Sequence, residues 1–177
     1  MGILTPYDYR PARSRPLAKA GARFILWHHS GGGHTDAARC VRYLQSSVVS
    51  YHFVIGGDGT VIQCVPIERG ANHCGPRVKR GKAYNLFHGE PVGNGDCLGV
   101  CFVGSDKPTP AALAAAKELQ RRLPDLPNLG HFEVCMPRGR KQDPVEGVMQ
   151  HLRQGTLALD FRMRMSEKTL DALRRSC

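Results

Sequence analysis

The chain has 177 residues, of which 41% are hydrophobic and 23% charged, a composition that excludes disordered and collagenous proteins. This length fits one domain with a core large enough to fold without a disulfide or a structural metal, so a metal, if one binds, is expected to serve chemistry. The net charge of +10 favours an anionic partner. Nucleic acid, membrane headgroups and cell-wall polymers all satisfy that condition, and charge alone does not choose among them.

The seven cysteines are an odd number, and no two have the spacing of a zinc knuckle or a redox motif. Residues 1–15 lack the apolar core of a signal peptide, and no apolar stretch is long enough to span a bilayer. We therefore expect mostly reduced thiols, no stable membrane insertion, and synthesis in a cytoplasm.

The first elements place two histidines at the end of a strand. Residues 1–22 are rich in proline and arginine and are predicted to form an N-terminal arm, with the catalytic domain at 23–177. Residues 23–29 form an apolar run that predicts a buried strand, and it ends in His28 and His29 just before a glycine-rich turn. Binding sites in α/β sheets gather at such strand ends.

A helix and a hairpin follow. Thr35 or Asp36 can cap a helix that runs to about Ser47. Two strand-like runs, residues 51–55 and 60–65, flank an Asp-Gly turn and predict a β-hairpin. Residues 66–96 are predicted to be loop.

The second half alternates strands and helices. It predicts a strand at 98–103, a helix from Thr109-Pro110 to Leu123, and a further strand end at Gly130-His131. Two shorter helices are predicted around 145–154 and 167–175. The fold class expected is a single α/β domain, with a central mixed β-sheet flanked by helices and a site at the strand ends.

Three residues from distant segments could form a metal site. A catalytic zinc takes three protein ligands and keeps a fourth position open. His28, His131 and Asp143 are candidate ligands of the right kind, since two lie at strand ends and the third precedes a proline in a loop. Each also has an ordinary explanation, because strand-end histidines are common and an aspartate before proline is often a turn or cap residue.

Five short sequence words occur in an order that resembles a known family. The words are Trp27-His28-His29-Ser30, residues 50–60, Asn94 through Val100, residues 130–134, and residues 140–144. The order resembles the zinc N-acetylmuramoyl-L-alanine amidases, a group that includes bacteriophage lysozyme-like endolysins and the peptidoglycan recognition proteins. The resemblance covers roughly residues 23–150, and the ordered set is more specific than any single word.

The resemblance implies roles for five residues. Zinc would be held by His28, His131 and Asp143, and Tyr51 and Lys141 would be catalytic. Zinc lowers the pKa of its water toward ~7, which gives a nucleophile for an amide carbonyl. Lys141 would stabilise the oxyanion, and Tyr51 would hydrogen-bond the water or that oxyanion. Without the resemblance, Lys141 reads as a solvated cation and Tyr51 as a core aromatic.

Two features depart from the family pattern, and two of the candidate ligands, His28 and Asp143, have alternatives nearby in the sequence. Cys101 stands where some members carry a glutamate base, and the stretch from His131 to Asp143 is longer than in compact members. Cys135, in or just past the strand of His131, is therefore a rival third ligand. His29 is the fallback for His28, because side chains alternate along a strand and only one of the pair can face the site.

Two other polar residues are candidates for substrate binding. His73 lies in a loop resembling the family's Ala-x-His-x-Gly word. Like His73, Asn94 is a candidate for contact with the substrate. The basic stretch at 77–82 is interpreted as solvated, and residues 161–165 as part of a surface helix. The remaining histidines are interpreted as ordinary: His34, His52, His88 and His151.

The expected function is hydrolysis of the bond between N-acetylmuramic acid and L-alanine in peptidoglycan by a monomeric, phage-type endolysin. It would be made in a bacterial cytoplasm and act on the wall after release. The alternatives are a peptidoglycan receptor without catalysis and a cytoplasmic amidase that recycles wall fragments. A basic nucleic-acid-binding protein is disfavoured, because the chain has no recognisable nucleic-acid motif.

Overall fold

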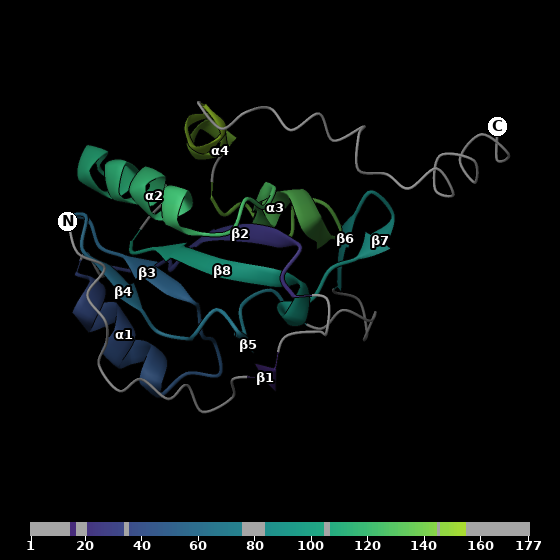
Figure 1. The fold of residues 1–177 in the computed structure, drawn as a ribbon, viewed down its shortest axis with the longest axis horizontal. Helices are drawn as coiled ribbons and strands as arrows, with labels where there is room; N and C mark the ends of the chain where they lie inside the picture. The colour runs from purple at the N-terminus through teal and green to yellow at the C-terminus, as the bar shows by residue number, and fades with distance from the viewer. Residues whose placement is uncertain are drawn as a thin grey trace, which may run out of the picture.

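A five-stranded mixed sheet forms the centre of the computed structural model, which describes residues 15–16, 21–33, 36–75, 84–104, 107–144 and 146–154 (Figure 1). The strand order is β4-β3-β8-β2-β9. The four strands β2, β3, β8 and β9 run parallel, and β4 pairs with β3 antiparallel. Their bounds are β2 Phe24–His29, β3 Phe53–Ile55, β4 Val61–Gln63, β8 Cys97–Phe102 and β9 Asn128–Gly130. The predicted mixed sheet is confirmed.

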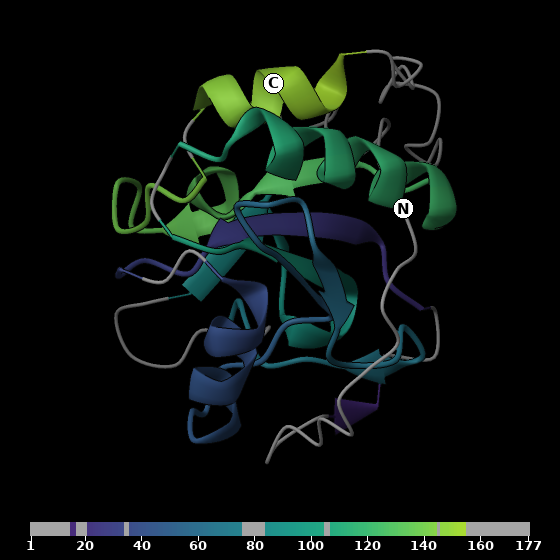
Figure 2. The same ribbon diagram turned by 90° about the vertical axis from the view of Figure 1, so that its left-hand side faces the viewer.

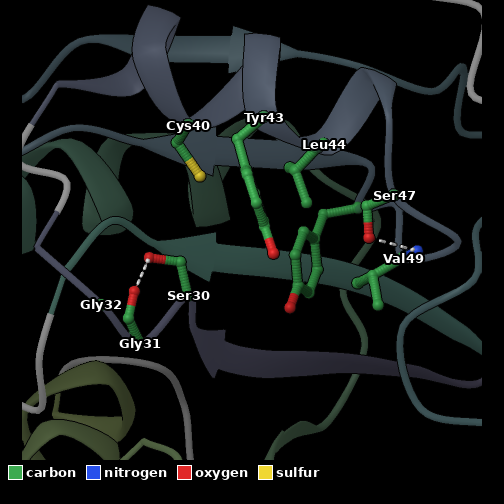
Figure 3. Close-up of a pocket in the computed structure, with 9 residues that line it drawn as sticks. Ser30, Gly31, Gly32, Cys40, Tyr43, Leu44, Ser47 and Val49 are labelled. Atoms are coloured by element: carbon green, nitrogen blue, oxygen red, sulfur yellow. Dashed lines mark hydrogen bonds between the residues drawn. The ribbon is translucent and has the colours of Figure 1, made fainter.

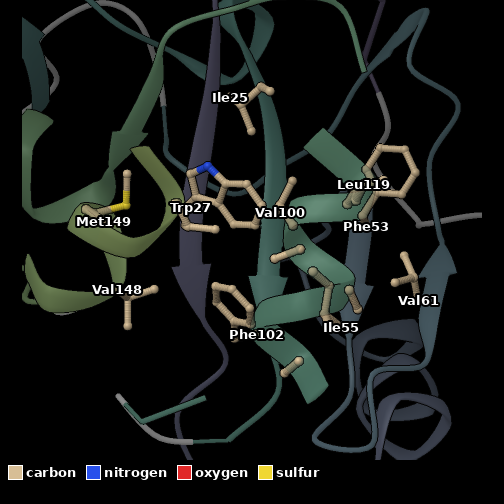
Figure 4. Packing of buried hydrophobic residues seen from close by; sticks show 14 residues of the cluster. Ile25, Trp27, Phe53, Ile55, Val61, Val100, Phe102, Leu119, Val148 and Met149 are labelled. Atoms are coloured by element: carbon tan, nitrogen blue, oxygen red, sulfur yellow. The ribbon is translucent and has the colours of Figure 1, made fainter. Parts of the chain in front are cut away.

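Helices cover both faces of this sheet, as Figure 2 shows. Helix α1, Ala37–Gln45, lies on one face, and α2, Pro110–Arg122, and α4, Glu146–Arg153, lie on the other. Because side chains alternate along each strand, the two faces of the sheet carry separate hydrophobic cores. Trp27 and Phe102 stack with ring centroids 5.5 Å apart in the core beneath α2 and α4 (Figure 4). The opposite face packs Val54 and Cys101 against α1.

The caps of the two longer helices explain where they begin. The Asp36 carboxylate accepts a hydrogen bond from the Arg39 N–H, and the Thr109 hydroxyl accepts one from the Ala112 N–H. Pro110 occupies the first turn of α2. Both starts agree with the prediction, although α1 ends at Gln45, two residues before the predicted Ser47.

The region predicted as loop contains short strands, so that prediction is wrong in part. Strand β5, Arg69–Gly70, pairs with β1, Arg15–Pro16. Strand β6, Tyr84–Phe87, pairs with β7, Glu90–Pro91, and with β10, Cys135–Met136, and the 3-10 turn η1 covers Asn94–Asp96. Strands of two to four residues are too short for alternation to be visible in a sequence.

His131 begins a helical turn instead of continuing a strand. Strand β9 ends at Gly130, and α3 covers His131–Val134. The Gly130 N–H donates to Glu133 Oε2 at 2.6 Å, which caps this turn. The expectation that Cys135 lies in or just past the strand is therefore wrong, because Cys135 follows α3 and begins β10.

Several predictions fall on residues that the structure does not describe. These are the helix at 167–175, the surface-helix interpretation of 161–165, most of the arm at 1–22, the basic stretch at 77–82, and His34. Among the residues described, no helix is both long enough and apolar enough to cross a membrane.

Candidate active site

His28, His131 and Asp143 come together at the ends of two neighbouring parallel strands. Strand β9 pairs with β2 so that Gly130 lies opposite Trp27, and the residues that follow these two, His131 and His28, lie side by side. Their ring centroids are 4.7 Å apart. The Phe132 N–H donates to the Asp143 carbonyl at 3.1 Å, and this bond fixes the distant loop beside α3.

The three side chains are spaced as ligands of one divalent cation would be. The Asp143 Oδ2 atom lies 3.2 Å from His28 Nδ1 and 3.3 Å from His131 Nδ1. One donor atom of each residue lies within 4.8 Å of the others, and all three residues are buried. Ligands about 2.0–2.1 Å from a tetrahedral zinc are themselves about 3.3 Å apart. The residues present therefore fit a zinc ion.

Burial and hydrogen bonding together set the protonation states that cation binding requires. Desolvation lowers the pKa of His28 to about 4, so its imidazole is neutral at physiological pH. Burial alone would raise the pKa of Asp143, yet hydrogen bonds with His131 and His28 hold it well below its usual range. Nε2 of His131 is buried and has no hydrogen-bond partner in the described part of the chain, which is rare for a buried polar atom.

His73 touches the first ligand from the side opposite Asp143. Its Nδ1 atom lies 3.0 Å from His28 Nε2, and the two rings meet edge to face. His73 comes from the loop after β5 and is itself 8% exposed. It thus contacts a candidate ligand directly.

Asn94 holds the loop that carries His73. Its Oδ1 atom accepts hydrogen bonds from the N–H groups of His73, Cys74 and Gly75, at 2.9–3.0 Å. Its Nδ2 donates to Asn72 Oδ1 at 2.7 Å. These contacts describe an anchor for the loop; substrate contact by Asn94 stays a prediction.

The candidate ligands His28, His131 and Asp143 are called the ligand group below. Tyr51 lies between this group and a neighbouring pocket. Its ring centroid is 5.2 Å from that of His28, and its hydroxyl shares a hydrogen bond with the thiol of Cys101. Desolvation raises the pKa of Tyr51 well above its usual value, so the hydroxyl keeps its proton and remains a donor.

The pocket beside Tyr51 has a volume of about 440 Å³ and is lined by uncharged residues (Figure 3). Helix α1 and the turn after it form one wall, with Tyr43 and Leu44 pointing into it. The turn after β2 forms the facing wall through Ser30 and the two glycines that follow. Tyr43 is 60% exposed at this wall, so a ligand can reach it from solvent. The pocket therefore offers an uncharged surface of mixed apolar and polar character beside Tyr51.

Lys141 lies in the same loop as Asp143, on the exposed side of the site. Its positive charge contributes to the lowered pKa of His28, which places the charge within electrostatic reach of the ligand group. The side chain is exposed. A cation held there can reach a substrate oxygen without being buried in the free protein.

The family is shown by a match over most of the chain. The N-acetylmuramoyl-L-alanine amidase family matches residues 18–146. The chain belongs to this family. Peptidoglycan-recognition protein SD of Drosophila melanogaster is 30% identical over 112 residues, which are 55% of this chain and 51% of that protein. The chain thus spans about half the length of this curated relative.

Solved structures of two other proteins share the amidase fold. Drosophila PGRP-LB superposes with a TM-score of 0.58 at 18% identity, covering 82% of this chain and 87% of that one. The endolysin amidase LysCS from Clostridium intestinale gives a TM-score of 0.56 at 17% identity, covering 84% and 91%. These likenesses extend the family assignment to the three-dimensional fold.

The structure shows what surrounds the two cysteines considered in the sequence, Cys101 and Cys135. Desolvation raises the pKa of Cys101 well above its usual value, so a thiolate base is disfavoured at the position where some members carry glutamate. The sulfur of Cys135 lies 3.6 Å from the Phe132 carbonyl and 3.8 Å from the Lys141 carbonyl. Among the described residues, Asp143 and not this thiol belongs to the group of side chains that could hold a metal ion.

His52 and Gly99 are site residues that the sequence did not single out. A Cβ atom on Gly99 would lie 2.6 Å from the His73 ring, so only glycine lets that ring pack there. His52 accepts a hydrogen bond from the Gly99 N–H at 2.9 Å and donates one to the Arg69 carbonyl at 2.7 Å. The only signal in the sequence is that both belong to words shared with the family.

The buried histidines predict a loss of stability in mild acid. Desolvation lowers the pKa of both His28 and His52 to about 4, whereas an unfolded chain would titrate near 6.5. The unfolded state therefore binds more protons between these two pH values. The stability contributed by these two neutral imidazoles should be complete above about pH 6.5 and should be lost toward pH 4, by up to about 3 kcal/mol per imidazole.

Urea unfolding of the metal-free protein across this pH range would measure the effect. His52→Asn keeps an acceptor for the Gly99 N–H and removes one titrating ring, so its stability should depend less steeply on pH than that of the parent. Equal slopes for the two proteins would contradict the assignment of His52 as a neutral buried imidazole.

Proposed function

We propose that this chain is a zinc-dependent N-acetylmuramoyl-L-alanine amidase that cleaves the amide between N-acetylmuramic acid and L-alanine in peptidoglycan. The observation that carries the proposal is the buried group of His28, His131 and Asp143, with donor atoms within 4.8 Å of one another. A protein that only binds peptidoglycan has no need for three buried ligands around one point.

The residues around this group suit amide hydrolysis. When bound, zinc supplies Lewis acidity, which makes water a competent nucleophile near neutral pH. Lys141 would offset negative charge that develops on the substrate carbonyl oxygen. The Tyr51 hydroxyl, which its raised pKa keeps protonated, would donate a hydrogen bond to the same region. The uncharged pocket beside Tyr51 would receive part of the substrate.

Peptidoglycan is proposed as the substrate for two reasons. The first is family membership. The second is that peptidoglycan recognition protein-LE, whose solved structure has a TM-score of 0.54 to this chain at 16% identity, was crystallised with tracheal cytotoxin, a monomeric diaminopimelic acid-type peptidoglycan. The net charge of +10 would also attract the chain to anionic wall polymers.

Chemical analysis of digested peptidoglycan tests the reaction. We expect stem peptides with free L-alanine amino termini, no new reducing sugar ends, and loss of both products when a chelator removes zinc. Restoration by added zinc is the control for chelator damage. New reducing ends would make the protein a glycosidase, and binding without turnover by the zinc-loaded protein would make it a receptor.

The biological role is proposed to be that of a phage-type endolysin. Comparing two substrates separates this role from recycling of wall fragments. An endolysin should solubilise intact sacculi at a rate comparable to its cleavage of soluble muropeptides. Strong preference for the soluble fragments, with intact sacculi left undigested, would favour the recycling role.

A further inference from the structure

The two ring nitrogens of His28 face different partners. Nδ1 lies 3.2 Å from Asp143 Oδ2, and Nε2 lies 3.0 Å from His73 Nδ1. All three residues are less than 10% exposed, so water does not compete freely for these contacts. A hydrogen bond between two neutral imidazole nitrogens needs one donor and one acceptor.

The ligand role of His28 decides which nitrogen carries the proton. A nitrogen that binds a cation must offer its lone pair, and Nδ1 is the nitrogen that faces Asp143. The proton of the neutral ring then resides on Nε2, which donates it to His73 Nδ1. Histidine ligands of metals commonly donate their other N–H in this way, and the acceptor fixes both the tautomer and the ring orientation.

His73 is itself held in place at its ring and at its backbone. Its ring packs against Gly99, where a Cβ would approach to 2.6 Å, and its backbone N–H donates to Asn94 Oδ1 at 3.0 Å. Gly99 is in turn held by its hydrogen bond to His52. A side chain fixed this firmly is suited to orienting a neighbour.

We propose that His73 is a positioning residue for the zinc ligand His28, accepting its Nε2–H and thereby presenting Nδ1 to the cation. This inference rests on the zinc site proposed above, and it differs from the expectation that His73 binds substrate. It also gives Asn94, Gly99 and His52 a common role, because Asn94 holds the backbone of His73, Gly99 leaves room for its ring, and His52 holds Gly99.

Zinc affinity of the full chain, measured by competition with a chromophoric chelator, tests the proposal without requiring turnover. His73→Leu fills the space and removes the acceptor, so zinc should bind about 10–100-fold more weakly. His73→Asn places an oxygen near the position of Nδ1 and should stay within a few-fold of the parent. His151→Leu removes an imidazole from α4 and should bind zinc like the parent.

A second pair of variants keeps the test valid if His73→Leu does not fold. His73→Gln carries the same amide as His73→Asn, but its oxygen lies one bond further out. We expect His73→Asn to bind zinc about tenfold more tightly than His73→Gln. Equal affinities for this pair would overturn the proposal.

The outcomes separate this inference from the proposed activity. Unchanged zinc affinity in His73→Leu together with a raised KM for a muropeptide would make His73 a substrate contact and overturn the inference alone. Weakened zinc binding in a protein that never cleaves peptidoglycan would support the inference and refute the amidase activity.

Discussion

Replacing Asp143 by alanine should abolish amidase activity and weaken zinc binding by on the order of 10²–10³-fold, since one of three protein ligands is lost. The carboxylate is also the contact common to both histidines, at 3.2 and 3.3 Å, so its removal leaves two imidazoles facing each other without an anion between them. Equilibrium zinc titration and release of L-alanine amino termini would measure the two effects.

Asp143→Cys is the matched control for this experiment. A thiolate is itself a zinc ligand, so the cysteine variant should regain most of the zinc affinity that alanine loses. If Asp143→Ala binds zinc as tightly as the parent, Asp143 is not a ligand, and the buried thiol of Cys135 becomes the residue to test next. Loss of activity in both variants with zinc retained in Asp143→Cys would point to a second role for the carboxylate.

The meeting of His28, His131 and Asp143 could be predicted because all three occupy recognisable words, and the two histidines lie at or just after strand ends. His28 follows an apolar run before a glycine-rich turn, and side-chain alternation makes it, and not His29, face the interior. His29 instead accepts a hydrogen bond from the Gly31 N–H. Pairing of β9 with β2 then brings His131 to the same place, a consequence of strand order that no local pattern reveals.

The roles of His73, His52 and Gly99 could not be predicted from local sequence, because they depend on contacts between segments far apart in the chain. His73 lies 45 residues from the ring it contacts. Gly99 reads as an ordinary strand glycine until the His73 ring is seen against it. The short strands β5, β6 and β7 escaped prediction for a related reason. Their pairing with distant partners, not their own residue pattern, defines them as strands.

The contacts of His28, His73 and Gly99 converge because they lie on the same face of the central sheet. His28 and Cys101 are opposite one another in the register of β2 and β8, and Gly99 precedes Cys101 by two residues on the same face. This face carries α1 over one part and the loops of Tyr51 and His73 over the rest. The opposite face is filled by the apolar core under α2 and α4. A polar site can therefore be built on one side of a sheet whose other side supplies stability.

Removing the charge of Lys141 should slow catalysis without weakening zinc binding. Lys141→Met keeps the length of the side chain and removes its charge, so kcat should fall about 10²–10³-fold, the range seen when one oxyanion-stabilising group is lost. The zinc affinity should stay within a few-fold, because the side chain is exposed and lies outside the ligand group. Parallel measurement of kcat, KM and the zinc dissociation constant separates these effects.

Two further variants test whether the positive charge must be located at residue 141 for its effect on kcat. Lys141→Arg keeps the charge on a broader, planar group, and should recover part of kcat but not all of it. Lys107→Met removes an exposed lysine just before α2 and should leave kcat unchanged, which controls for the net charge of +10. Because Lys141 is attached to the same loop as Asp143, its effect on kcat at constant zinc affinity would show that this loop supplies both a ligand and a charge to the reaction. If Lys141→Met has the kcat of the parent, the loop contributes only the ligand Asp143 to the reaction, and Lys141 is a solvated cation without a catalytic role.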